Sequence, residues 1–245
     1  MSTDPNPGLP RQQGLCHPRP IVKLRKTSIS LPAEHVWLDG LLAHAPDVRG
    51  LVVILQTSVG QHRDSREAYL AGQLQQAGFA TLILDLITRY EDSRDPDIRY
   101  NVPLLARRIE AAAEWIEHQP PLEGLAVGLL AATTGSGAII RAAAKAPERF
   151  HALVCRAGRP DLAGAGPLRT LILPLRLLVG DLDTGQAMLR QAFDLVGGPK
   201  DWAVVDGAGE LFIEPGALEA AGRLAGEWFQ RHLPPPARPK TDPHS

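Results

Sequence analysis

The segment Ala131-Ala132-Thr133-Thr134-Gly135 has the residue types and spacing of a turn that presents a hydroxyl group. It follows an apolar run and precedes a stretch with a helical pattern, and small residues stand two positions before and two positions after Thr133. Small residues at those places let a strand and a helix approach closely around a tight turn. Threonine keeps a hydroxyl, but its β-branch restricts χ1 and crowds a strained backbone. Thr133 is therefore either a nucleophile or a packed, hydrogen-bonded residue at the turn.

The elements that would position this turn alternate along the chain. Rough alternation over 23–31 and 35–42 predicts an opening hairpin joined near Pro32. Apolar runs predict strands, most of them buried on both faces. These strands cover 50–55, 79–86, 125–131, 152–155, 175–179 and 202–205. Apolar residues at helical spacing predict helices over 65–77, 103–117, 134–146, 184–196 and 217–233.

This alternation predicts an α/β fold: a mostly parallel central sheet with helices on both faces and an antiparallel hairpin at its N-terminal edge. Ligands in such sheets bind beyond the carboxyl ends of the strands. The loops that matter on that rule are 56–64, 133–135, 180–183 and 206–210. We expect one domain over 21–233. Two disordered, proline-rich tails would flank it, over 1–20 and 234–245.

In their order and spacing, these segments resemble the α/β-hydrolase superfamily, in its dienelactone hydrolase-like branch. The resemblance runs from about residue 23 to residue 233. It rests on the strand 51–55 with its loop and on the stretches 81–86, 128–137, 156–162, 177–183 and 211–218. The resemblance implies an α/β-hydrolase fold with a Ser-His-Asp site for hydrolysis of esters or lactones.

The resemblance places the family's nucleophile at Thr133, its acid at Asp183 and its histidine at Glu210. In the family the acid orients an imidazole; here Asp183 could instead cap the helix predicted from Thr184. A carboxylate with a pKa of about 4 is a far weaker base toward an alcohol than imidazole. Contact between Asp183 and Glu210 would raise the pKa of one of them. Otherwise Glu210 points to solvent or to a basic group.

The loop after the first buried strand also departs from the family, which carries His-Gly where this chain has Gln56-Thr57. Oxyanion donors are backbone groups, so these changes need not destroy them. The N–H of Thr134 lies at a helix N-terminus, which favours anions. We predict Gln56, Thr57, Thr134 and His62 as oxyanion or ligand-binding residues, in a site that tolerates anions even without a competent nucleophile.

Other side chains could supply the missing chemistry. His62 is the best substitute base, with a solvated loop histidine as the alternative. Cys155 ends a strand near the site, but a thiolate nucleophile needs an activating base, and a buried small side chain is the default. Ser58 and Ser136 are further hydroxyls near the turn.

Charged residues near the site leave two more options. Arg156 and Arg159 follow a strand into a functional loop, where they could pair with an anionic ligand or with Asp161 or Asp183. Asp183 together with Glu210 is a weak signal for a divalent cation. We predict no metal ion and no cofactor.

The composition excludes several classes of partner. A formal net charge of -1 gives no electrostatic case for nucleic acid or an anionic membrane. Cys16 and Cys155 do not make a disulfide framework, and residues 1–20 lack the apolar core of a secretory signal, so we expect a cytoplasmic protein. No apolar run approaches the roughly 18 residues of a membrane helix. A small-molecule ligand or substrate is the expected partner, and a homo-oligomer stays open.

Two functional hypotheses follow. In the first, a protein with a hydrolase fold has lost or altered serine-type hydrolysis and binds a small ligand or a protein partner, because Gln56, Thr133 and Glu210 replace the family's residues. In the second, Thr133, Asp183 and Glu210 form a rewired site that acts on a small carbonyl compound. A purely structural interaction module would need a site filled by side chains.

Overall fold

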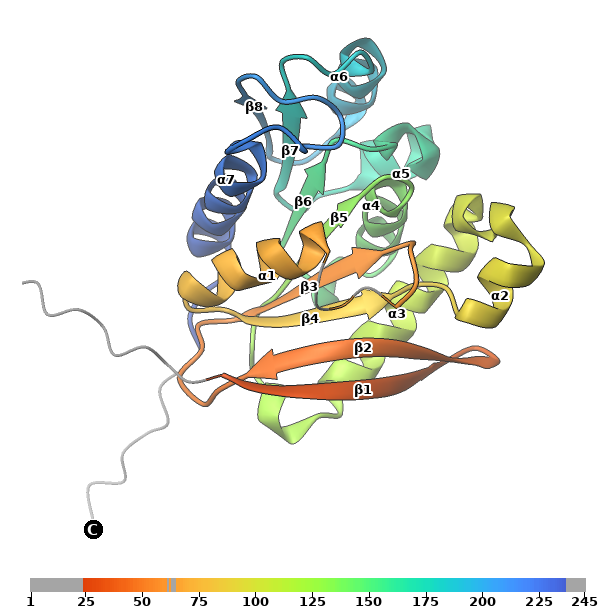
Figure 1. The fold of residues 1–245 in the computed structure, drawn as a ribbon, viewed down its shortest axis with the longest axis vertical. Helices are drawn as coiled ribbons and strands as arrows, with labels where there is room; N and C mark the ends of the chain where they lie inside the picture. Colours follow the sequence, from red (N-terminus) through yellow and green to blue (C-terminus); the bar gives the residue numbers. More distant parts are fainter. Residues whose placement is uncertain (1–23, 61, 63–64, 237–245) are drawn as a thin grey trace, which may run out of the picture.

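The computed structural model describes residues 24–60, 62 and 65–236. Strands and helices alternate along this part of the chain and build one layered α/β structure (Figure 1). The tail predicted over 1–20 lies outside the described residues, as does 237–245 of the predicted C-terminal tail. Residues 234–236 are described and form neither helix nor strand.

Within the described residues, eight strands form one sheet in the order β1-β2-β4-β3-β5-β6-β7-β8. They are β1 (Arg25–Ala33), β2 (Val36–His44), β3 (Leu51–Gln56), β4 (Ala80–Asp85), β5 (Val127–Ala132), β6 (Ala152–Arg156), β7 (Leu175–Gly180) and β8 (Lys200–Val205). The pairs β1–β2 and β2–β4 are antiparallel, and the remaining neighbours are parallel. The predicted fold, a mostly parallel sheet with an antiparallel N-terminal hairpin at its edge, is confirmed.

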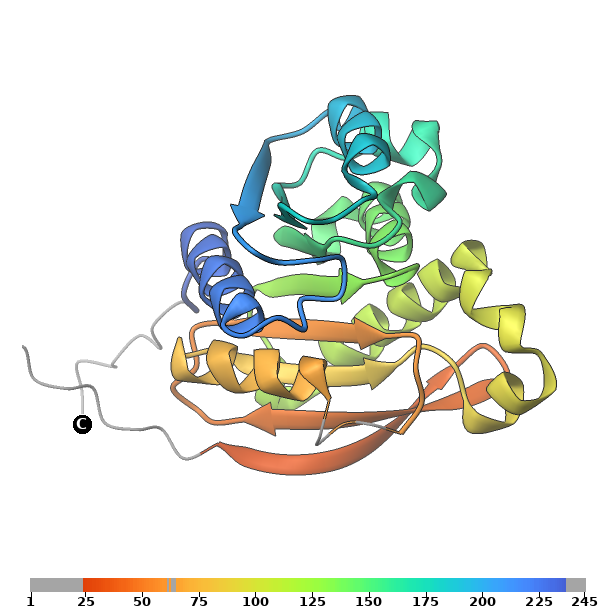
Figure 2. The same cartoon turned by 45° about the horizontal axis from the view of Figure 1, so that its top comes forward.

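Two groups of helices cover the two faces of this sheet (Figures 1 and 2). On one face lie α1 (Arg66–Gln76) and α7 (Ala217–His232), packed side by side. On the other lie α3 (Val102–Glu117), α4 (Gly135–Lys145), α5 (Ala165–Thr170) and α6 (Gln186–Leu195). Side-chain caps mark several helix starts, as at Ser65, whose hydroxyl accepts the Ala68 N–H before α1.

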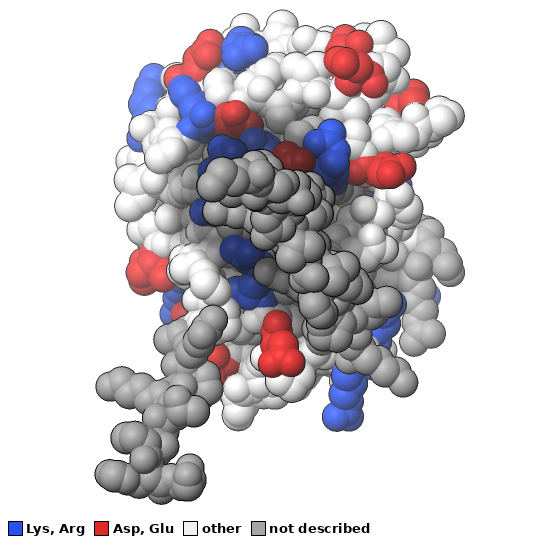
Figure 3. Space-filling view, turned by 90° about the vertical axis from the view of Figure 1, so that its left-hand side faces the viewer, with Lys and Arg blue, Asp and Glu red and all other residues white. Residues whose placement is uncertain are grey.

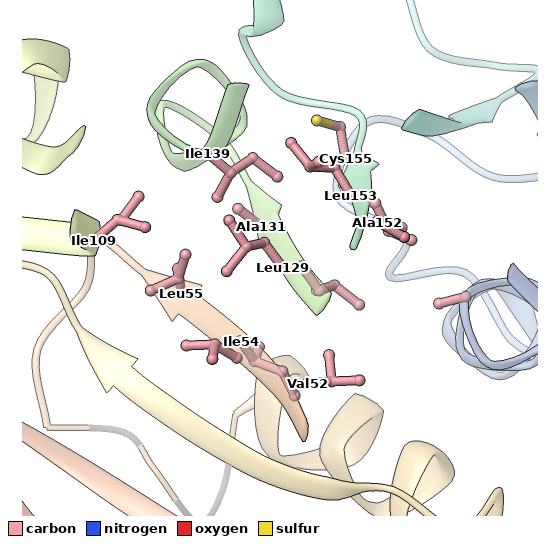
Figure 4. Packing of buried hydrophobic residues seen from close by; sticks show 14 of the residues in the cluster. Val52, Ile54, Leu55, Ile109, Leu129, Ala131, Ile139, Ala152, Leu153 and Cys155 are labelled. Atoms are coloured by element: carbon pink, nitrogen blue, oxygen red, sulfur yellow. The ribbon is translucent and has the colours of Figure 1, made fainter. Parts of the chain in front are cut away.

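The core lies between the sheet and these two helix layers. Every residue of β3, β4, β6 and β7 is buried, as continuous apolar runs predict for strands covered on both faces. Figure 4 shows side chains of β3, β5 and β6 together with Ile109 of α3 and Ile139 of α4, all of them members of one buried hydrophobic cluster. A core packed this closely holds the carboxyl ends of the strands rigidly, and the loops of the site begin there.

The opening hairpin turns two residues later than predicted. Pro32 pairs with Trp37 inside the β1–β2 ladder, and the turn is made by Glu34 and His35. Glu34 has a φ of 56°, the left-handed conformation that two-residue hairpin turns need at a central position. Proline is tolerated here because β1 is an edge strand, where one side of the backbone has no ladder partner among the described strands.

The segment between β4 and α3 contains structure that the sequence patterns did not predict. It forms α2 (Arg89–Arg94) and a 3₁₀ helix (Pro96–Tyr100). Thr88 and Glu91 close a capping box at the start of α2. Neither helix buries a residue completely, so the segment lacks the apolar periodicity by which a helix is recognised.

Charges of both signs occur on the face seen in Figure 3, where Lys and Arg lie near Asp and Glu at several places. Among the described residues, no helix combines the length and apolar character that spanning a bilayer requires.

Candidate functional site

The turn from β5 to α4 has the geometry predicted for it. Thr133 has a φ of 51°, a left-handed conformation that is strained for a β-branched residue. A Cβ placed on Gly135 would lie 3.1 Å from the Ala131 Cβ, so the strand and the helix approach as closely as small residues allow. Gly158, after β6, backs the turn: a Cβ there would lie 2.5 Å from both the N and the O of Thr133.

The Thr133 side chain is exposed rather than packed. Its Oγ1 lies 3.2 Å from Thr57 Oγ1, and either hydroxyl can donate in this hydrogen bond. The alternative in which Thr133 is a packed residue is therefore wrong as to packing, although the side chain is hydrogen-bonded. The hydroxyl at the tip of the turn is accessible to a ligand.

Asp183 is buried and engaged locally. Its Oδ1 accepts the Gly185 N–H at 2.7 Å, and its Oδ2 has no partner in the described part of the chain. Helix α6 begins at Gln186 with Gly185 as its N-cap, so the prediction that Asp183 caps a helix from Thr184 is wrong. The carboxylate instead closes a turn just before the helix.

Glu210 is exposed at the rim of the site. The pKa of Arg159 is raised, mainly by its hydrogen bonds to Asp161, and the charges of Asp161 and Glu210 raise it further. Glu210 thus faces solvent near a basic group. Across the described residues, no hydrogen bond joins Thr133, Asp183 and Glu210 to one another.

The loop after β3 is organised around Asp85, at the end of β4. Asp85 is buried and accepts hydrogen bonds from Gln56 Nε2 and, at 2.8 Å, from the Gly60 N–H. His62 Nε2 lies 2.9 Å from Asp85 Oδ1, in a contact that is not aligned as a hydrogen bond. This histidine, the predicted substitute base, is directed to Asp85 and does not line the recess described next.

A recess of about 490 Å³ opens at the Thr133 hydroxyl. The predicted residues Gln56, Thr57, Thr134, Thr133 and Glu210 all line it, and so does Ser58. Arg66 and Glu67 of α1, Arg99 and Tyr100 of the 3₁₀ helix, and Arg156 at the end of β6 complete much of the wall. We call this cavity the Thr133 recess. It is open, so the site is not filled by side chains.

An ion pair stands in the wall of the recess. Arg156 Nη2 donates to Glu67 Oε1 at 3.0 Å, and the arginine side chain is 3% exposed. Its guanidinium also lies 5.7 Å from the centre of the Phe212 ring. Burial lowers the pKa of Arg156, while the neighbouring Glu67 opposes that shift. Arg156 is therefore fixed between α1 and the loop after β8.

Two of the substitute groups predicted from the sequence, Cys155 and Ser136, are buried inside the fold, whereas Ser58 is exposed and lines the recess. Cys155 is fully buried, and burial raises the pKa of its thiol to about 12, so it remains a neutral thiol. Ser136 is buried too and donates to the Ala157 carbonyl at 3.1 Å. Both side chains serve the packing behind the turn.

Several residues that line the recess were not predicted from the sequence. Arg66 and Glu67 occupy the first turn of α1, directly after the predicted site loop, and that placement was a usable signal. Arg99 and Tyr100 belong to the unpredicted segment before α3, where no pattern marked them. Thr134 donates to the Arg99 carbonyl at 2.6 Å, so this segment is tied to the turn.

A solved dienelactone hydrolase from Anabaena variabilis has the same architecture. It is 38% identical to this chain with a TM-score of 0.81, and the match covers 86% of this chain and 99% of that one. The chain belongs to the dienelactone hydrolase family. No family model matched the sequence.

More distant structures share the fold of this dienelactone hydrolase relative. Est1E from Butyrivibrio proteoclasticus is 12% identical with a TM-score of 0.67, over 83% of this chain and 98% of that one. A dienelactone hydrolase-like promiscuous phosphotriesterase from metagenomic libraries is 16% identical with a TM-score of 0.69, over 86% of this chain and 99% of that one. At these identities the likeness shows the fold alone.

Curated relatives come from Mycobacterium tuberculosis. A protein of strain CDC 1551 with the name "Putative phosphoribosyl transferase" is 38% identical over 211 residues, which are 86% of this chain and 47% of that protein. Its counterpart in strain H37Rv matches equally. The chain therefore spans about half the length of the curated relatives it matches.

Proposed function

We propose that this dienelactone hydrolase-family chain binds a small molecule in the Thr133 recess and has lost, or strongly slowed, serine-type hydrolysis of esters and lactones. One observation carries the proposal. Among the described residues, the hydrogen-bond partner of Thr133 Oγ1 is Thr57, another neutral hydroxyl. An alcohol becomes a nucleophile when a base takes its proton, and a second alcohol does not act as that base at neutral pH.

The two carboxylates at the other family positions do not supply the missing base in the arrangement described. Glu210 is exposed near Arg159, and Asp183 accepts the Gly185 N–H. In a serine protease, loss of the serine or of the histidine lowers turnover roughly 10⁶-fold. Turnover of ordinary esters by this chain is expected to fall by a comparable factor below that of an intact enzyme.

The shape and the polar lining of the recess favour ligand binding even without a catalytic base. The recess is open, and polar side chains line it from several elements. Thr134, at the N-terminus of α4, also lines it, and a helix N-terminus presents N–H groups and partial positive charge to a bound anion. Binding can therefore outlast the loss of the nucleophile.

A second candidate function is hydrolysis of a small carbonyl compound by a rewired Thr133, Asp183 and Glu210 site. The observation that favours it is the left-handed backbone at an exposed Thr133. Such strain costs on the order of 1–3 kcal/mol and is concentrated at functional sites. Closure of Glu210 onto Thr133 with a bound substrate would be required.

Hydrolysis of p-nitrophenyl acetate by purified protein separates the two candidates. The matched set is wild type, Thr133→Ala, Glu210→Gln and the double variant Thr133→Ser with Glu210→His. We expect the first three to show the same slow background rate and the double variant to hydrolyse the ester faster than all of them. The matched rates would mean that neither side chain takes part in turnover.

A different pattern of rates would favour the second candidate. A wild-type rate that falls to background in both Thr133→Ala and Glu210→Gln, with unchanged circular dichroism, would establish the rewired hydrolase. The name of the curated relatives does not decide between the candidates, because this chain spans about half of their length.

A further inference from the structure

Two guanidinium groups converge beside the Thr133 recess. Arg66 Nη1 donates to the Leu211 carbonyl at 2.8 Å, and Arg156 Nη1 donates to the same oxygen at 3.4 Å. Burial lowers the pKa of Arg156, Glu67 opposes this shift, and the charge of Arg66 adds to it. Two like charges held this close repel each other, and an anion bound between them would offset that repulsion.

One arginine of the recess differs from the others in its partners. Three arginines line the recess, Arg66, Arg99 and Arg156. Arg156 is paired with Glu67, and Arg99 is paired with Asp92, which lies outside the recess. In the part of the chain that the structure describes, Arg66 has a carbonyl partner but no carboxylate partner. The charge of Arg66 is therefore left for an anionic ligand.

The residues around the recess also carry hydrogen-bond donors that have no acceptor among the described residues. The Arg156 side chain is 3% exposed, and its Nε has no partner among the described residues. A buried N–H on a charged group is unfavourable unless it finds an acceptor. Ser58 and Ser65 line the same recess, so their hydroxyl groups add donors to those of the arginines and to the backbone N–H of Thr134 at the start of α4.

We propose that the Thr133 recess holds the phosphomonoester group of a small-molecule ligand, bound by Arg66 and Arg156 with the hydroxyl groups at the carboxyl end of β3. This inference rests on the proposed function, because it names the class of ligand for the same recess. The donors outnumber the two oxygens of a carboxylate. A phosphomonoester offers three terminal oxygens and a charge of about -1.5 to -2 at neutral pH, which suits the unpaired charge of Arg66 beside Arg156.

Isothermal titration calorimetry with simple anions tests the assignment. The probes are inorganic phosphate, methyl phosphate and acetate, each at the same ionic strength. The test variant is Arg66→Gln, because Arg156→Gln would leave Glu67 buried without its partner and could prevent folding. The matched control is Arg223→Gln, which removes an equal charge from α7, where Arg223 pairs with Glu227 at 2.9 Å outside the recess.

Inorganic and methyl phosphate are expected to bind wild type and Arg223→Gln equally, and acetate more weakly. Arg66→Gln is expected to weaken both phosphates about tenfold or more, the loss that follows removal of a charge-assisted hydrogen bond. The assignment is overturned if neither phosphate binds wild type, if acetate binds as tightly as phosphate, or if Arg66→Gln binds like the control. Because this binding involves no turnover, rapid ester hydrolysis would contradict the proposed function and leave the phosphate site standing.

Discussion

Substitution of Gly158 by alanine probes how tightly the segment after β6 packs against the Thr133 turn. Gly158 has a φ of +83°, and its added Cβ would lie 2.5 Å from two backbone atoms of Thr133. Real Cβ atoms essentially never approach another heavy atom closer than 3.0 Å. A backbone atom cannot rotate away as a flexible side chain can, so the turn itself must shift.

Two separate costs add up in Gly158→Ala. The left-handed backbone costs an alanine about 1–2 kcal/mol relative to glycine. Forcing an extra methyl group into a packed site costs about 1–3 kcal/mol more. We therefore expect the free energy of unfolding to fall by about 2–5 kcal/mol.

Two other glycines separate these costs in urea denaturation measurements. Gly78 has a φ of +92° with nothing within 4 Å of an added Cβ, so Gly78→Ala is expected to lose only the backbone cost of about 1–2 kcal/mol. Gly72 lies inside α1, also with open space, so Gly72→Ala is expected to gain about 0.5–1 kcal/mol. Close packing at the turn is refuted if Gly158→Ala loses no more stability than Gly78→Ala.

Three further predictions concern Asp85, Cys155 and Glu91. Asp85→Asn removes an acceptor for the loop after β3, so amide hydrogen exchange at Gly60 is expected to accelerate; unchanged exchange would mean that Asp85 does not hold the loop. Cys155, with a pKa of about 12, is expected to resist iodoacetamide at pH 8 in the native protein and to react after denaturation. Peptide mapping measures the labelling, and labelling of the native protein would place the thiol nearer the surface. Burial raises the pKa of Glu91, but hydrogen bonds from Arg108 and Thr88 outweigh it and leave that pKa lowered. Its contribution to stability is therefore present above the unfolded pKa of about 4.3 and is lost as pH falls through the folded pKa. Glu91→Gln should flatten the acid limb of a stability–pH curve, and an identical acid limb would contradict this.

Most of the fold could be predicted because buried elements have recognisable patterns of apolar residues. Strands such as β3 and β4 are covered on both faces, so their residues are continuously apolar. The hairpin turn was misplaced because proline usually interrupts strands, and only the position of β1 at the sheet edge makes Pro32 acceptable. That edge position depends on the whole sheet and is not written in the local pattern.

The parts of the site that depend on residues close together in the sequence could be predicted. Thr133 and Thr134 follow from a local motif, and the loop after β3 follows from the rule that ligands bind at strand ends. Arg99 could not be predicted, because its 3₁₀ helix has no apolar pattern and lies beside the recess through tertiary contacts such as the hydrogen bond from Thr134. The direction of a side chain such as Glu210 likewise depends on its tertiary neighbours.

Among the described residues, no base contacts the Thr133 hydroxyl, and labelling with a fluorophosphonate probe followed by peptide mass spectrometry tests whether this hydroxyl is activated. Such probes react with a hydroxyl that a neighbouring base has activated. We expect Thr133 to stay unmodified in the native wild-type protein under conditions that fully label an intact serine hydrolase. A stoichiometric adduct on Thr133 would contradict it.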